Sequence, residues 1–329
     1  MTYLSYNRSQ AARLFYPAGV FKSILMQTPR KRYPDDHWLR SHDSARALEA
    51  YLEQQSKSYS VVKNNFISEL LGDLSGKRFL DYGCGAGMFS VHAAKQGAIE
   101  VVGVDAEDSV LATARFFAES EGVGSKCAFI KSATFPSLPR IRGFDVILLK
   151  DVIEHVADDQ ALVETAARYL TPGGIMVLST QNSLSLNYLI EGTYHKKILG
   201  KKNWQGWDET HLRFYTSLSL SRIIRKAGLE PQAWRSVYII PHKIPKPGSS
   251  GKAFFRIEAF SWLDRTLGAV FPYNRLGWNI IVSAQDSGLA PSKSRINPVI
   301  QRVMPTAPIS VNRNALELKE GKTPEPKTV

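Results

Sequence analysis

The chain has little cysteine and no long apolar run. Its 329 residues include two cysteines, Cys84 and Cys127, which are far apart in the sequence. This number excludes a disulfide framework and suits a reducing compartment. No run reaches the roughly 18 apolar residues that a membrane-spanning helix needs. Basic residues and a proline interrupt the apolar residues of the N-terminus, which lacks a secretory pattern. We therefore expect a globular cytoplasmic protein.

The whole chain has a formal net charge of +12. Acidic residues are scarce outside its middle part. Residues 41–190 carry 13 basic and 18 acidic side chains, whereas residues 191–285 carry 15 basic and 6 acidic ones. Residues 1–40 and 286–329 are also net basic. The split indicates an acidic core domain with basic additions that could meet an anionic substrate or lipid head groups. Basic residues that only keep the protein soluble explain it equally well.

Between Lys77 and Thr180, short apolar runs alternate with stretches of helical periodicity. This alternation predicts an α/β fold, in which helices cover both faces of a parallel sheet. The expected strands are Arg78–Asp81, Glu100–Asp105, Lys126–Lys131, Phe144–Leu149 and Ile175–Thr180. The expected helices between them are Met88–Gln96, Ser109–Glu121 and Gln160–Leu170.

The regions on both sides of this unit are also patterned. Ser41–Leu74 predicts two helices that pack on the sheet, and a cap at Thr216 predicts a helix that runs through Lys226. Two further strands are expected at Trp234–Ile240 and Trp278–Ala284. The expected organisation is an N-terminal extension (1–42), one domain (43–285) with a helical insertion before the last strand (241–275), and a disordered tail (286–329).

Three glycines follow the first expected strand at alternate positions, and Asp81 precedes Gly83, Gly85 and Gly87. Such a turn lets the backbone approach a ligand, and the next helix offers free N–H groups. A dinucleotide fingerprint has its third glycine one residue later, and a carboxylate such as Asp81 would repel a pyrophosphate. The same carboxylate favours a ligand with an ammonium group, such as S-adenosylmethionine (SAM).

Asp105 ends the next expected strand, where a carboxylate can accept hydrogen bonds from both hydroxyls of a ribose. Together with Asp81-x-Gly83-x-Gly85-x-Gly87, it resembles the cofactor motifs of class I SAM-dependent methyltransferases. Phe144–Val156 resembles the fourth strand of that family and its loop, and Leu170–Gly174 resembles the turn before the fifth strand. His211–Thr216 is similar to a segment of a subgroup with ubiquinone-pathway and natural-product O-methyltransferases.

The resemblance covers roughly residues 60–285 and implies a doubly wound, Rossmann-like seven-stranded sheet with SAM as cofactor. It implies cofactor contacts from Asp81, Gly83, Gly85, Gly87, Asp105, Ala106, Ser132, Ala133 and Lys150. The sequence departs from the family after the third strand, where the acid that often reads the adenine amino group is absent. Ser132 or the backbone of Ala133 would take that role.

Candidate catalytic residues lie where loops leave the carboxyl edge of the expected sheet. His155 follows the fourth strand and can hold or release a proton near neutral pH, as a general base must. His211 is a second candidate and Asp151 a third. For both histidines a purely structural role, in packing or in orienting a loop, is an open alternative.

Asp151, Glu154 and His155 resemble a Glu-x-x-Glu-His sequence with which some ubiquinone-pathway O-methyltransferases and the small-RNA terminal methyltransferases bind a divalent cation. Such a set could hold Mg²⁺ or Zn²⁺ and lower the pKa of the acceptor. In this chain the first position is the shorter Asp151, and many metal-free relatives look similar. We expect no metal, with these three residues as the alternative site.

The expected function is methyl transfer from SAM to a small-molecule acceptor, with a hydroxyl oxygen as the preferred atom. The aromatic residues between 181 and 215 would suit an apolar or aromatic acceptor, or fill a core or lid. One alternative is an RNA methyltransferase, although residues 191–285 contain no recognisable RNA-binding motif. Another is a SAM-binding protein without catalysis.

The segment Phe254–Phe271 has more apolar side chains than a solvent-exposed helix needs. Packing on the sheet is the commonest outcome for such a segment. It could also cap the active site, form a dimer contact, or make a peripheral membrane contact assisted by basic neighbours such as Lys252. No specific nucleic acid partner is expected, and the sequence does not indicate an oligomeric state.

Overall fold

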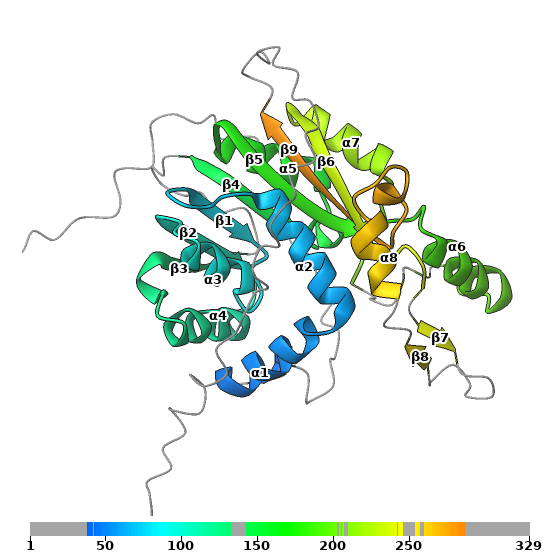
Figure 1. The fold of residues 1–329 in the computed structure, drawn as a ribbon, viewed down its shortest axis with the longest axis horizontal. Helices are drawn as coiled ribbons and strands as arrows, with labels where there is room; N and C mark the ends of the chain where they lie inside the picture. Colours follow the sequence, from blue (N-terminus) through cyan, green and yellow to red (C-terminus); the bar gives the residue numbers. More distant parts are fainter. Residues whose placement is uncertain are drawn as a thin grey trace, which may run out of the picture.

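A seven-stranded sheet forms the centre of the molecule (Figure 1). The computed structural model describes residues 38–41, 43–132, 143–202, 204, 206, 210–241, 243–245, 254–256 and 260–286. The strand order is β3-β2-β1-β4-β5-β9-β6. The bounds are β1 Arg78–Tyr82, β2 Glu100–Asp105, β3 Cys127–Lys131, β4 Phe144–Lys150, β5 Leu170–Gln181, β6 Leu229–Val237 and β9 Asn279–Asp286. Strands β1 to β5 pair in parallel, and β9 runs antiparallel to both β5 and β6.

Helices cover both faces of this sheet, as the sequence pattern predicts. Side chains of β4 alternate between the faces, so that Leu148 lies in one hydrophobic cluster and Leu149 in the other. One cluster includes buried residues of α2 (Ser58–Leu71) and α3 (Met88–Lys95), and the other includes residues of α5 (Asp159–Tyr169) and α7 (Ser217–Lys226). Helices α1 (Ser44–Gln55) and α4 (Asp108–Ser120) pack together beside the first of these layers. The doubly wound architecture is therefore confirmed.

Several expected boundaries are confirmed and others shift. The two helices expected over Ser41–Leu74 are α1 and α2, and the cap at Thr216 forms a reciprocal capping box with Ser219. The turn expected at Leu170–Gly174 belongs to β5 instead, because Leu170 pairs with Phe144 and a register shift follows. The segments 1–37 and 287–329, which include the expected disordered tail, lie outside the described residues.

The insertion before the last strand contains a hairpin as well as a helix. Strands β7 (Lys243–Pro245) and β8 (Phe254–Arg256) pair in antiparallel fashion, and α8 spans Phe260–Leu267. Helix α8 contacts α2 and β6, so its described part packs on the body of the domain. None of the helices in the described ranges is both long and apolar enough to cross a membrane.

Asp264 fastens α8 to the end of β6. Its side chain is fully buried, and its two carboxylate oxygens accept hydrogen bonds from the backbone N–H groups of Tyr238 (2.8 Å) and Ile239 (3.0 Å). We expect Asp264→Ala to lower the free energy of unfolding by about 2–4 kcal/mol, because two buried donors lose their partner. Urea denaturation measures this, with the exposed Thr266→Ala on the same helix as control. A loss no larger than that of the control would contradict this role.

Candidate active site

The glycine turn joins β1 to α3 with all three glycines in the left-handed region of backbone conformation. A Cβ atom at Gly83 would lie 2.4 Å from Val152 Cγ2, so packing explains this glycine. At Gly85 the nearest atom to a Cβ would be Trp38 Cη2 at 3.9 Å. A Cβ at Gly85 would thus make an ordinary van der Waals contact, so the positive φ of 53° rather than crowding accounts for this glycine. Gly87 caps the N-terminus of α3.

Two carboxylates flank this turn at the positions the sequence predicts. Asp81 is almost fully buried and accepts a hydrogen bond from Ser90 Oγ (2.8 Å), and burial raises its pKa to about 6. Asp105 accepts hydrogen bonds from the backbone N–H groups of Gly85 (3.0 Å) and Ala106 (2.7 Å). Burial raises the pKa of Asp105, and these donors partly oppose the rise. A buried carboxyl group beside this turn suits the ammonium group of SAM.

For the other predicted cofactor residues, Ser132, Ala133 and Lys150, the structure gives fewer contacts near the turn. Ser132 directly follows β3, and its backbone N–H donates to the carbonyl oxygen of Asp105 (2.9 Å). Ala133 lies outside the described residues. The Nζ atom of Lys150 lies 5.9 Å from the ring centre of Phe89, and its charge lowers the pKa of Asp81. Burial lowers the pKa of Lys150 itself. The adenine and ribose contacts of these residues remain predictions.

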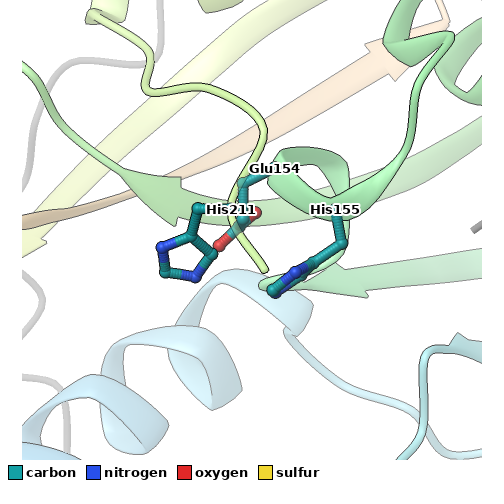
Figure 2. A group of neighbouring side chains, drawn as sticks. All are labelled: Glu154, His155 and His211. Atoms are coloured by element: carbon teal, nitrogen blue, oxygen red, sulfur yellow. The ribbon is translucent and has the colours of Figure 1, made fainter. Parts of the chain in front are cut away.

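The loop after β4 brings together Glu154, His155 and the distant His211 (Figure 2). Their potential ligand atoms all lie within 4.8 Å of one another. The two imidazole rings are 4.8 Å apart between centroids, and the side-chain amide of Gln181 lies 3.2 Å from His211 Nε2. The sequence predicts both histidines as candidates but gives no sign that they meet.

His155 is held by the segment that precedes His211. Its Nδ1 atom lies 3.0 Å from Thr210 Oγ1 and 3.3 Å from the carbonyl oxygen of Thr210. The hydroxyl can donate to Nδ1 or accept from it, whereas the carbonyl oxygen can only accept. With the hydrogen on Nδ1, the lone pair of the neutral ring is on Nε2, as a general base needs.

Glu154 is fully buried, and its Oε2 accepts a hydrogen bond from Thr180 Oγ1 (2.9 Å). Its other oxygen, Oε1, has no hydrogen-bond partner among the described residues. Burial, and then the charge of Asp151, raise the pKa of Glu154 to about 8. Burial and the neighbouring charge thus favour the neutral form of this carboxyl group.

Asp151 directly follows β4, where the sequence predicts a catalytic candidate, and it lines the same cavity as His155. Its backbone is left-handed (φ 54°), and its side chain forms an ion pair with Lys63 and accepts a hydrogen bond from Ser179 Oγ (2.9 Å). Burial opposes its ionisation, but the charges of Lys63 and Lys150 outweigh this and hold its pKa below the usual range. The structure groups Glu154 and His155 with His211 rather than with Asp151.

A cavity of about 410 Å³ lies beside these groups. Its lining includes His155 and His211 together with residues that sequence reasoning misses. These are Gln54, Gln55, Tyr59, Ser60, Lys63, Asn64, Gln181, Trp278 and Asn279. The available signal is weak: Lys63 and Asn64 are polar residues within the apolar pattern of α2, and both are buried.

Comparisons with known proteins agree with this geometry. A family model described as "Methyltransferase domain" matches residues 51–233. A ubiquinone biosynthesis O-methyltransferase of Cereibacter sphaeroides (strain KD131) is 36% identical over 159 residues, which are 47% of this chain and 61% of that protein. The protein of the same name in Neisseria meningitidis serogroup A is 31% identical over 166 residues, 48% of this chain and 66% of that protein. The chain thus spans less than two thirds of the length of these relatives.

The fold also occurs among solved structures. A chain of the Haloferax volcanii complex between the Trm112 methyltransferase activator and a methyltransferase superposes with a TM-score of 0.50 and 13% identity. The match covers 74% of this chain and 97% of that chain, and at this identity it shows the fold alone. The family model covers more than half of the 329 residues, and the sheet order and the glycine turn agree with it. The chain belongs to the class I SAM-dependent methyltransferase family.

Proposed function

We propose that the chain transfers a methyl group from SAM to a hydroxyl group of a small molecule, with His155 as the general base. The observation that supports this best is that His155 lines the same cavity as Lys150, whose charge acts on Asp81 at the glycine turn. The cavity thus joins the proposed base to one predicted cofactor residue, Lys150, whereas Asp81 and the three glycines of the turn are not among its lining residues. A cytoplasmic setting belongs to this proposal, and both cysteines are free, which agrees with it.

The cofactor would supply a methyl group on a sulfonium, a good leaving group. The residues of the chain would then do the rest. Asp81 would bind the ammonium group, and Asp105 would accept hydrogen bonds from the ribose. His155 Nε2 would take the proton from the acceptor hydroxyl as its oxygen attacks. The cavity walls would hold the acceptor in line with the methyl group and exclude water.

The lining of the cavity supports an acceptor with several hydrogen-bonding groups. Five of its thirteen lining residues carry carboxamide side chains, and Asn64 Oδ1 and Gln181 Oε1 have no hydrogen-bond partner among the described residues. The aromatic side chains of the cavity wall are Tyr59 and Trp278, neither of which belongs to the segment 181–215 from which the sequence predicts aromatic walls. An acceptor that combines a ring with polar substituents could contact both the aromatic and the carboxamide side chains of the cavity. The identity of the acceptor remains a prediction, to be found by labelling a host extract with methyl-labelled SAM.

Binding of SAM should depend on the ionisation of Asp81. Because burial raises the pKa of this carboxyl to about 6, we expect the affinity to fall as the pH drops from 7.5 toward 5.5, where Asp81 becomes neutral. Asp81→Asn should weaken binding by about 10- to 100-fold at pH 7.5 and remove the dependence below pH 7. Isothermal titration calorimetry measures both effects, with the exposed Thr266→Ala on α8 as a control for the general pH response. Unchanged affinity in Asp81→Asn would refute the ammonium contact.

Replacement of the proposed base should affect turnover and leave cofactor binding intact. We expect His155→Gln to lower kcat by about 10²–10⁴-fold, the usual contribution of a general base, with the Kd for SAM unchanged. Steady-state kinetics with the identified acceptor and calorimetry with SAM measure the two quantities. A kcat within about threefold of wild type would remove His155 from the mechanism.

A divalent cation is a second way to activate the acceptor hydroxyl. For such a cation, the geometry favours Glu154, His155 and His211 as ligands over the set with Asp151 that the sequence suggests. A carboxylate and two imidazoles are suitable ligands, and the buried Glu154 Oε1 has no hydrogen-bond partner among the described residues. Such an ion would lower the pKa of an acceptor hydroxyl.

We expect kcat to be the same before and after chelation with EDTA, because a protein base would suffice. Adding Mg²⁺ or Zn²⁺ back should then have no effect. Activity that EDTA abolishes and the ion restores, and that Glu154→Gln also abolishes, would replace the general base with the cation.

A further inference from the structure

Helix α6 and the π-helical turn that follows it present large apolar side chains to solvent. Helix α6 spans Leu186–Thr193 and η4 spans Tyr194–Ile198, at one end of the molecule (Figure 1). Apolar residues along this segment are between 46 and 70% exposed. They are Leu186, Leu189, Ile190, Tyr194, Ile198 and Leu199, which we call the α6 stripe.

The orientation of this helix is the reverse of an ordinary surface helix. Its buried residues are Asn187 and Gly192, whereas leucine and isoleucine at the spacing of one helical face point outward. The inner side is well anchored. Trp204 lies close to Gly192 and stacks on His195, with the two rings 4.9 Å apart and 6° from parallel. The helix is therefore packed on the domain through its inner side while its apolar side chains face solvent.

The charges beside the stripe are almost all positive. Lys197, Lys201 and Lys202 are exposed, and none of them forms an ion pair within the part of the chain that the structure describes. Glu191 is the one acidic residue between positions 184 and 202 of the sequence. An apolar stripe flanked by lysines is the pattern of a helix that lies in the interface of an anionic bilayer.

From these observations we infer that the α6 stripe docks on the surface of an anionic lipid membrane. A second copy of the chain fits less well, because a symmetric contact through this face would bring the lysines of both copies together. The helix also lies close to the cavity. Tyr188 of α6 contacts Phe214 (centroids 4.8 Å apart), which contacts Trp278 of the cavity wall (5.7 Å). Docking would hold the cavity wall near the lipid surface.

Vesicle binding of the full chain tests this inference without reference to methyl transfer. Flotation with phosphatidylcholine vesicles, with and without phosphatidylglycerol, should show binding that needs the anionic lipid and weakens with salt. Ile190→Gln/Ile198→Gln should lower the partition coefficient at least tenfold, as expected from roughly 1 kcal/mol or more for each apolar side chain. Replacement of Lys201 and Lys202 by Gln should weaken binding about fivefold for each lysine.

Trp262→Gln on α8 is the matched control, because Trp262 is 62% exposed and lies in the segment that the sequence suggests for a membrane contact. We expect it to bind vesicles like wild type. Circular dichroism and SAM affinity should be the same in all variants, which verifies folding. Loss of binding in Trp262→Gln with none in the α6 variant would move the contact to α8 and overturn the inference. A dimer in analytical ultracentrifugation that Ile190→Gln/Ile198→Gln dissociates, without vesicle binding by wild type, would assign the stripe to a second copy.

Discussion

The ion pair between Lys63 and Asp151 determines the shape of the site. It joins α2 to the loop after β4, and Ser179 of β5 adds a hydrogen bond to the same carboxylate. The side chain of Lys63 is 7% exposed, so loss of one partner would leave a nearly buried charge, at a typical cost of about 3–5 kcal/mol. This pair fixes the polar face of α2 over the sheet edge. Tyr59 and Asn64 therefore line the cavity together with residues from the strands.

The same ion pair helps to shift the pKa values of two nearby carboxyl groups, Asp151 and Glu154, in opposite directions. Asp151 has two lysines near it and remains ionised, because their charges outweigh the effect of burial on its pKa. Glu154 lies three residues later, is fully buried, and is next to the charge of Asp151, so its pKa rises to about 8. Neighbouring carboxyls with pKa values shifted in opposite directions are typical of functional sites. A carboxyl group with a raised pKa thus lies beside the two histidines, whereas the pKa of Asp151 is held below its usual range.

Local patterns were enough to predict the sheet and the glycine turn. Periodicity identifies the strands, and the alternating glycines, with Asp81 before them, identify a turn that needs positive φ values at all three glycines. The meeting of His155 and His211 needs the path of the chain between them, and the partner of Asp151 needs the packing of α2 on the sheet. Both are tertiary facts that spacing does not contain. Likewise, β6 begins at Leu229, before the strand expected from Trp234, because pairing with β9 extends it past a bulge between Pro231 and Ala233.

The uneven charge of the sequence is partly neutralised by folding. Arg213 pairs with Asp159 (2.8 Å) and Arg235 pairs with Glu69 (2.5 Å), so basic residues of the second half meet acidic residues of the first half. These contacts show that a basic segment in the sequence is not in itself a basic surface. Lys197, Lys201 and Lys202 differ, because they make no ion pair within the described ranges and lie beside exposed apolar side chains. The paired arginines are partly neutralised, so the three unpaired lysines are the better indicator of a surface that could bind an anionic partner.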